Sequence, residues 1–232
     1  MSTVHVLSGG AAHGLVKQLE GSFAADTGYD IAGTYNAVGV MRDQLLARAP
    51  CDVVILTAVL IAQLEASGHV MPGSARTLGR VKTGIAVRTG AAQPAVGSPD
   101  QLKTALLDST AIFLPDPVKA TAGIHFMNVL KQLGIDAHVA DRLRPYPNGA
   151  TAMGEMAKTH QTGVIGCTQV TEILYTVGVQ LVAELPRAFE LATEYAAAIS
   201  AQAENPHAAG KLIALLSGVH AAPFRQAGGF DM

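Results

Sequence analysis

The amino-acid sequence predicts an α/β protein in which each sheet is mostly parallel and is flanked by helices. Short apolar, β-branched runs alternate with amphipathic segments along most of the chain, which is the pattern of β-strands joined by crossover helices. The chain has 232 residues, a length that suits one large domain or two lobes of ordinary size. Hydrophobic residues make up 49% of the sequence and charged residues 15%, so the material for a sizeable core is present.

The strand pattern occurs several times, separated by helical patterns. The predicted strands are Val4–Leu7, Ile31–Tyr35, Asp52–Leu56, Gly84–Val87, Ala111–Leu114, Ala137–Ala140 and Gly163–Gly166. Apolar residues at helical spacing predict helices at Gly14–Thr27, Val38–Ala49, Leu60–Ala66, Leu102–Leu107, Gly123–Leu133 and Ala150–Thr159. A last helix is expected to begin near Asn205-Pro206, because proline is favoured in the first turn.

Composition excludes several kinds of partner. The formal net charge is −2 and the chain has no tryptophan, so we expect neither nucleic acid nor an anionic membrane as a partner. The longest apolar run, near Val53–Ala62, is about half a membrane span. The first ten residues lack the basic and apolar regions of a secretory signal. A cytoplasmic location is therefore expected, with a periplasmic location as the alternative if a signal peptide was removed.

Residues that follow the predicted strands are the candidates for ligand binding. Ligands of open α/β sheets bind beyond the carboxyl ends of the strands, where helices begin. The residues at these positions are small, polar or glycine-rich, so their backbone N–H groups suit an anion. The candidate ligand-binding residues are Ser8, Gly9, Gly10, Asn36, Ala37, Val38, Thr57, Thr121, Ala122, Gly123, Asn148, Thr168 and Gln169. For Asn148, an ordinary N-cap is the alternative interpretation.

Three side chains are candidates for acid–base chemistry. His13 lies in the first turn of a predicted helix, where the positive helix end would keep the imidazole neutral and basic; a partly exposed helix histidine is the alternative. Lys119 suits a substrate carboxylate, or is simply solvated. Cys167 is either a proton carrier or a buried thiol. Cys51 and Cys167 fit no metal spacing, and we expect no metal and no cofactor.

Five segments resemble those of type 2 periplasmic-binding proteins, and in particular their molybdate-binding branch. The segments are Phe23–Ile31 (FAADTGYDI), Leu45–Val70, Arg80–Gly90 (RVKTGIAVRTG), Asp116-Pro117 with Ala122-Gly123-Ile124, and the closing segment Leu191–Met232. The resemblance implies two α/β lobes with one small solute bound in the cleft between them, and final helices that pack on the first lobe.

Lobe boundaries are predicted from this resemblance and from local composition. The stretch Thr89–Pro99 is rich in glycine, proline and small residues, which suits a connection between lobes. A second crossing is expected between Val182 and Thr193. We therefore place lobe one at residues 1–87 plus 191–232, and lobe two at residues 88–190.

The resemblance also carries expectations about the ligand. In molybdate-binding relatives, serine hydroxyls and backbone amides hold the oxyanion, and Ser8 and Ala122 match two of these positions. The second-loop serine is replaced within Asn36–Val38, and Gly166 or Cys167 stands where that branch has a tyrosine. The loss of two donors to a dianion costs roughly 1–3 kcal/mol each in a dry site. These replacements disfavour molybdate and suit carboxylates.

A smaller branch of the same fold, exemplified by aconitate isomerase, also resembles this chain. That resemblance implies a cofactor-independent isomerase that shifts a proton on a small unsaturated polycarboxylate. His13, Lys119 and Cys167, chosen above from their positions, are the candidates for the catalytic roles. The alternative is a binding protein for a carboxylate or a molybdate-type oxyanion, in an ABC importer or a sensor. An ABC permease is an expected partner only if the chain is exported.

Overall fold

The chain folds into two compact units in a computed structural model that describes residues 2–231. Unit 1 consists of residues 1–81 and 193–232, and unit 2 of residues 82–192. The chain leaves unit 1 within strand β4 (Arg76–Arg88) and returns at the start of β9 (Ala192–Ile199). Among the described residues, no helix is both long enough and apolar enough to cross a membrane.

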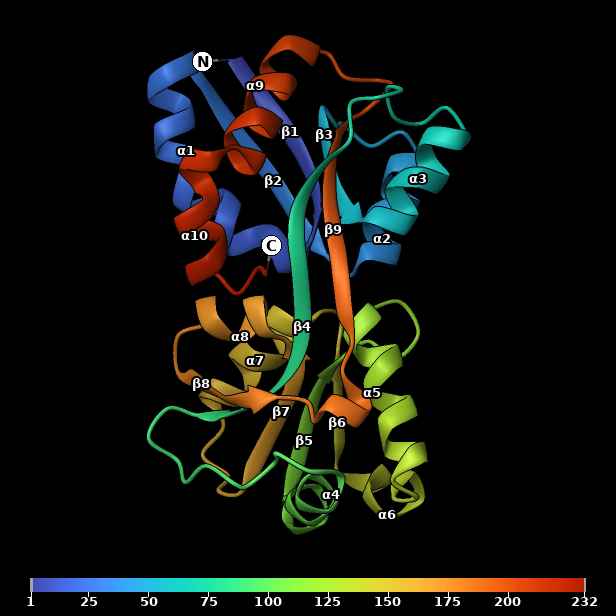
Figure 1. Cartoon of the computed structure of the whole chain (residues 1–232), viewed down its shortest axis with the longest axis vertical. Helices are drawn as coiled ribbons and strands as arrows, with labels where there is room; N and C mark the ends of the chain where they lie inside the picture. Colours follow the sequence, from blue (N-terminus) through green and yellow to red (C-terminus); the bar gives the residue numbers. More distant parts are fainter. Residues whose placement is uncertain (1, 232) are drawn as a thin grey trace. The chain divides into compact units, whose positions relative to one another are not determined.

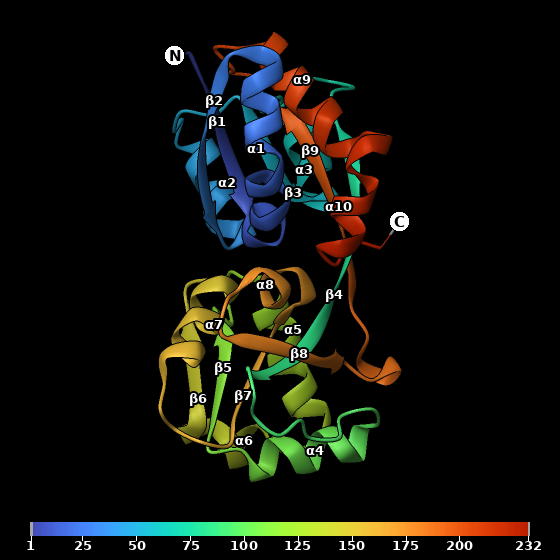
Figure 2. The same ribbon diagram turned by 90° about the vertical axis from the view of Figure 1, so that its left-hand side faces the viewer.

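Unit 1 is built on the strand order β2-β1-β3-β9, with β4 next to β9 (Figure 1). The strands β1 (Ser2–Gly9), β2 (Tyr29–Asn36) and β3 (Val53–Thr57) are parallel, and β9 is antiparallel to β3. One face of the sheet carries α1 (His13–Thr27), α9 (Pro206–Ser217) and α10 (Ala222–Ala227), and the other carries α2 (Val38–Leu46) and α3 (Ala58–Ala66) (Figures 1 and 2). Short 3₁₀ turns at Gly10–Ala12 and Val219–Ala221 precede α1 and α10.

The core of unit 1 explains the apolar character of its central strand. Residues Val53–Leu56 are fully buried, since helices cover both faces of the sheet. Phe23 of α1 and Leu212 of α9 are buried in the same cluster. The closing segment of the chain thus packs on unit 1.

Unit 2 is built on the strand order β8-β4-β7-β5-β6. The strands β5 (Ala111–Pro115), β6 (Leu143–Tyr146) and β7 (Val164–Gln169) are parallel, whereas β4 is antiparallel to β7 and to β8 (Val179–Glu184). Its helices are α4 (Pro99–Asp108), α5 (Thr121–Gln132), α6 (Asp136–Val139), α7 (Gly149–Lys158) and α8 (Val170–Tyr175), with 3₁₀ turns at Ala140–Arg142 and Arg187–Phe189. The α/β class and the largely parallel strand pairing agree with the sequence prediction.

One predicted strand is wrong, and three strands of the structure, β6, β8 and β9, were not predicted. Ala137–Ala140 belongs to α6 and the 3₁₀ turn that follows it, since its alanines favour helix and its one large apolar residue, Val139, is buried from a helix. The strand in this part of the chain is β6 (Leu143–Tyr146), whose residues are half-exposed. It contains Pro145, which is tolerated because β6 lies at an edge of the sheet. The strands β8 and β9 were missed; β9 has the alanine-rich sequence ATEYAAAI, and its pairing with β3 outweighs its helix propensity.

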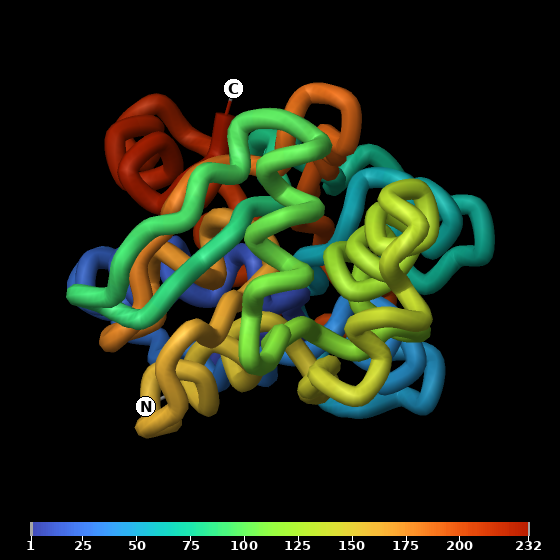
Figure 3. Tube along the Cα trace, turned by 90° about the horizontal axis from the view of Figure 1, so that it is seen from below, coloured from blue at the N-terminus to red at the C-terminus, as the bar shows by residue number. Residues whose placement is uncertain are grey.

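The glycine- and proline-rich stretch Thr89–Pro99 does not connect the units. It lies within unit 2 and joins β4 to α4, as the green trace in Figure 3 shows. The chain crosses instead inside β4, an extended strand of 13 residues. The prediction missed this because Arg76, Arg80 and Lys82 interrupt the apolar pattern of the strand. The predicted lobe boundaries were 87/88 and 190/191, and the units divide at 81/82 and 192/193.

Candidate functional site

The parallel strands of unit 1 bring the first group of predicted residues to one edge of the sheet. Gly9 lies opposite Asn36, and Ser8 lies opposite both Tyr35 and Ile55. Because β1, β2 and β3 run in the same direction, Ser8, Asn36 and Thr57 all lie at their carboxyl ends. The helices α1, α2 and α3 follow within a few residues, as the strand–helix pattern requires.

The Ser8–Gly10 turn is tightly packed. The Ser8 side chain is buried, and its hydroxyl donates to the Gly9 carbonyl at 2.8 Å. A Cβ at Gly9 would lie 2.7 Å from Val38 Cγ1 and 3.2 Å from Tyr195 Cε1, so only glycine fits there without displacement. A ligand that contacts the Ser8 hydroxyl must therefore compete with an existing internal bond.

The neighbouring strand ends are also ordered by local bonds. Asn36 Oδ1 accepts from the Ala37 amide at 2.8 Å, and Ala37 and Val38 are buried at the start of α2. Thr57 is the N-cap of α3, where its hydroxyl accepts from the Leu60 amide at 3.4 Å. These contacts order the backbone of each turn, and they already use the Ala37 and Leu60 amides.

His13 is stacked on Tyr35 at this edge of unit 1. The two ring centroids are 4.0 Å apart and the rings are inclined by 17°. Burial, helped by the positive charge of Lys17 and opposed by Glu20, lowers the pKa of His13 below its ordinary value of 6.5. The imidazole is therefore neutral near pH 7 and able to accept a proton.

Tyr35 is a residue that the sequence argument missed. Its ring lies over Gly33, where a Cβ would be 2.3 Å from the Tyr35 hydroxyl oxygen. Burial, with a contribution from Glu20, raises the pKa of Tyr35 to about 12, so the phenol stays protonated. The available signal was the glycine two residues before the tyrosine, because residues i and i+2 of a strand share one face.

The parallel strands of unit 2 bring together the second group of predicted residues. Pro115 of β5 lies opposite Tyr146 of β6, and Phe113 lies opposite Gly166 of β7. Consequently α5, α7 and α8 all begin at the carboxyl edge of these strands. The predicted residues at this edge are Lys119, Thr121, Ala122, Gly123, Asn148, Thr168 and Gln169.

The turn before α5 is closed by Asp116. Its Oδ1 accepts from the amides of Val118 at 2.7 Å and Lys119 at 2.9 Å, and the Lys119 side chain is exposed. Ala120 is the N-cap of α5 and supplies no side-chain cap. A Cβ at Gly123 would lie 2.3 Å from the Asp116 carbonyl oxygen, so glycine permits the first turn of α5 to pack on this turn.

The start of α7 contacts a buried carboxylate that the sequence argument also missed. Asn148 is the N-cap, and its Oδ1 accepts from the Thr151 amide at 2.8 Å. The Thr168 hydroxyl donates to Glu172 Oε2 at 2.5 Å. Burial raises the pKa of the Glu172 carboxyl, while bonds from Thr168 and from the amides of Ala150, Gln169 and Gly149 oppose that rise. The sequence signal was a threonine and a glutamate four residues apart at a strand end.

Cys167 is placed differently from the other predicted residues. It lies inside β7 opposite Ile85, and its side chain is fully buried in an apolar cluster. Burial raises the pKa of this thiol well above its ordinary value, so it is a neutral thiol. A proton carrier must reach its substrate, and we therefore leave Cys167 out of the proposed site.

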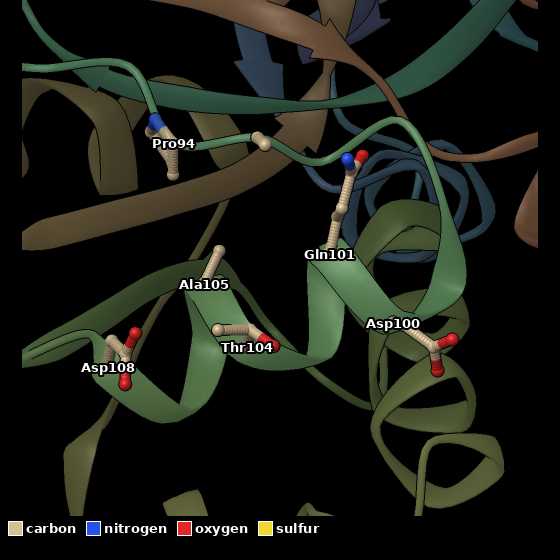
Figure 4. Close-up of a pocket in the computed structure, with 7 residues that line it drawn as sticks. Pro94, Asp100, Gln101, Thr104, Ala105 and Asp108 are labelled. Atoms are coloured by element: carbon tan, nitrogen blue, oxygen red, sulfur yellow. The ribbon is translucent and has the colours of Figure 1, made fainter.

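Two surface hollows lie away from these strand ends. One, of about 380 Å³, lies between α4 and the preceding segment, with the side chains of Asp100, Gln101, Thr104 and Asp108 along the helix (Figure 4). The other, of about 190 Å³, is at the opposite end of β3 from Thr57 and is lined by His5, Arg48, Ala49, Pro50, Cys51, Asp52, Gln202 and Glu204. Neither contains a predicted site residue. Among residues 2–231, no three His, Cys, Asp or Glu side chains are grouped so as to hold a metal ion.

Known proteins resemble the whole chain rather than a part of it. Aconitate isomerase of Pseudomonas sp is 25% identical over 228 residues, which covers 96% of this chain and 85% of that protein. The periplasmic molybdate-binding protein of Azotobacter vinelandii has a similar fold, with a TM-score of 0.81, 19% identity and 99% of each chain covered. The sulfate-binding protein SubI of Mycobacterium tuberculosis H37Rv gives a TM-score of 0.76 at 16% identity, covering 99% of this chain and 86% of the other.

The family itself follows from a match along almost the full length. Residues 4–231 match the family described as bacterial extracellular solute-binding protein. The fold similarities add that the architecture is that of periplasmic-binding proteins. This chain belongs to the bacterial extracellular solute-binding protein family and has a type 2 periplasmic-binding-protein fold like that of molybdate-binding proteins.

Proposed function

We propose that the chain is a cofactor-independent isomerase that moves a proton on a small unsaturated polycarboxylate, with aconitate as the first substrate to test. The observation that carries the proposal is the neutral His13 imidazole stacked on Tyr35 at the carboxyl ends of β1 and β2. The similarity to an aconitate isomerase across 96% of the chain supports the same reaction. A solute-binding fold alone does not specify a reaction, so the proposal rests on these residues.

The proposed reaction is an allylic proton shift. His13 accepts a proton from the saturated carbon next to the double bond, and the electrons of that C–H bond pass into the conjugated carboxylate system. Delivery of a proton to the other end of the allylic system then moves the double bond. The stacked Tyr35 ring holds the imidazole plane in place, and no oxidant or reductant is needed.

Unit 2, taken by itself, also has groups that suit carboxylates. The first amides of α5, at Thr121, Ala122 and Gly123, have no partners within the helix, as is true of any helix start. Such amides suit the carboxylate of a small anion. The exposed Lys119 ammonium is a second group that suits a carboxylate.

The direct test uses ultraviolet absorbance of cis- and trans-aconitate incubated with the purified chain. We expect interconversion by the wild type and a loss on the order of 10²–10⁴-fold for His13→Asn. The matched control is His160→Asn, since His160 is exposed in a polar loop, and this variant should retain wild-type turnover. Full activity in His13→Asn would show that His13 is not the catalytic base.

A second candidate function is a binding protein for a small carboxylate or a molybdate-type oxyanion. The match to a solute-binding family favours it, and an ABC permease is then the expected partner. Isothermal titration of aconitate, molybdate and sulfate discriminates the two functions. Tight stoichiometric binding of one of these anions, with aconitate left unchanged, would favour the binding protein.

A further inference from the structure

Glu172 of α8 is a buried carboxyl group within unit 2. The residue is 5% exposed, and the Thr168 hydroxyl donates to its Oε2 at 2.5 Å. The backbone amides of Gly149, Ala150 and Gln169 also donate to this carboxylate. The carboxyl oxygens of Glu172 are thus already bonded to four groups of the chain itself.

The carboxylate lies directly on the first residues of α7. A Cβ at Gly149 would be 1.9 Å from Thr168 Oγ1 and 2.0 Å from Glu172 Oε2, so only glycine leaves room for this arrangement. The next amide along the helix, that of Thr151, is bonded to the Asn148 side chain at 2.8 Å. The amides of the first three residues of this ten-residue helix are thus all bonded within the chain.

The other long helix at this edge differs. α5 has 12 residues, and its N-cap, Ala120, supplies no side-chain cap. At α7, by contrast, the first three amides are already bonded to side-chain oxygens of the chain, so this helix start offers no donor to an external anion. The first amides of α7 are therefore bonded to side chains, whereas those of α5 have no side-chain cap.

We propose that Glu172 determines which anions unit 2 accepts, because its carboxylate fills the anion position at the start of α7 and excludes a tetrahedral oxyanion from it. This inference deepens the proposed function and rests on it for the identity of the ligand. The position of Glu172 at the start of α7 does not depend on whether the protein turns over aconitate.

The test replaces the internal carboxyl group with an external anion. Glu172→Ala removes one CH₂ and one carboxylate, which together have the size of acetate, and leaves four donors without their acceptor. In acetate on the order of 100 mM, compared with chloride at equal ionic strength, we expect the Tm of Glu172→Ala to rise by about 3 °C or more. The wild type and Glu172→Gln should not respond, since their side chains still fill the space.

A second arm uses sulfate as the tetrahedral probe. We expect Glu172→Ala to bind sulfate at least about tenfold more tightly than the wild type in isothermal titration, equivalent to about 1.4 kcal/mol. Equal sulfate affinity, or a folded Glu172→Ala whose Tm does not respond to acetate, overturns the proposal.

The proposal can still be tested if Glu172→Ala fails to fold. If Glu172→Ala does not fold in chloride, its refolding yield is measured in acetate and in chloride: recovery in acetate supports the proposal, and no recovery overturns it. These readouts are thermal melts and titrations, which do not measure turnover. If the wild type does not convert aconitate, the proposed function is refuted, and this inference is still decided by the melts and titrations.

Discussion

Gly149 and Gly154 lie in the same helix, yet their surroundings differ. A Cβ at Gly149 would collide with Thr168 and Glu172, whereas nothing lies within 4 Å of a Cβ at Gly154. Both residues have ordinary helical backbone, because neither has a positive φ. The contrast separates a glycine required by a close contact from one that only lowers helix propensity.

The two glycines give a matched pair of stability predictions. We expect Gly149→Ala to lower the free energy of unfolding by about 1–3 kcal/mol, because the methyl group displaces the Glu172 carboxylate from its donors. Gly154→Ala should raise it by about 0.5–1 kcal/mol through helix propensity alone. Urea unfolding followed by circular dichroism measures both, and equal effects would contradict the contact geometry at Gly149.

The protonation of His13 predicts a pH profile. A base acts in its neutral form, and the pKa of His13 lies below 6.5, so kcat/KM should be level near pH 7 and fall only at a pH below 6.5. Lys17 contributes to the lowering, so Lys17→Met should move this acidic limb to higher pH. An unchanged limb in Lys17→Met, or a midpoint above 6.5 in the wild type, would contradict the assignment.

The same shift has a consequence for stability. Because the pKa of His13 is lower in the folded chain than the ordinary value of 6.5, the unfolded chain binds a proton more readily. The contribution of His13 to the free energy of unfolding is therefore complete above pH 6.5, and it is lost as the pH falls through the lowered pKa. His13→Asn removes this part of the pH dependence of Tm.

Residues at strand ends were predictable from the sequence, but their partners were not. The order of strand, turn and helix was enough to place Ser8, Asn36 and Thr57 at one edge. Tyr35 and Glu172 escaped prediction, because the stacking of Tyr35 depends on where α1 begins, and the role of Glu172 on α7 and α8 meeting in space. The local pattern held a signal near each residue, but it did not indicate which element each side chain would contact.

At the scale of elements, Asp52 ties three segments of unit 1. Its carboxylate accepts from the His5 amide of β1 and from the Asn205 amide that precedes α9, both at 2.8 Å. Asp52 itself is buried directly before β3. The closing segment is thereby connected to the first and third strands, which are separated from it by most of the chain.

This tie predicts a large effect from a small substitution. In Asp52→Asn one oxygen becomes an NH₂ group that faces a backbone amide, so a buried donor is left unsatisfied, and we expect a loss of about 1–3 kcal/mol. Asp43→Asn is the control: Asp43 pairs with Arg42 at 2.7 Å on the surface, and such pairs contribute about 0–1 kcal/mol. Equal losses in the two variants would contradict the role of Asp52.

Elements were predicted best where burial and periodicity agree. β3 and β5 are continuous buried apolar runs between polar turns, and both were found. β6 was assigned too early in the chain, since this half-exposed edge strand with a proline has little apolar pattern. β9 was missed because its sequence is rich in alanine, and this composition favours a helix. In the structure these alanines pair with β3.

At the scale of the whole molecule, the family is clearer than the activity. The match over residues 4–231 and the fold shared with proteins named for molybdate and sulfate fix the architecture. One fold serves many ligands and reactions, so the activity has to come from the site. The proposed isomerase depends on His13, whose ring is stacked on Tyr35.

The measurement that tests the central claim most directly is proton NMR of trans-aconitate incubated with the wild-type chain in D₂O. The account predicts that cis-aconitate forms and that deuterium enters the carbon that receives the transferred proton, with both changes lost in His13→Asn. Unchanged trans-aconitate with no deuterium at any carbon, in the presence of folded wild-type protein, would contradict it.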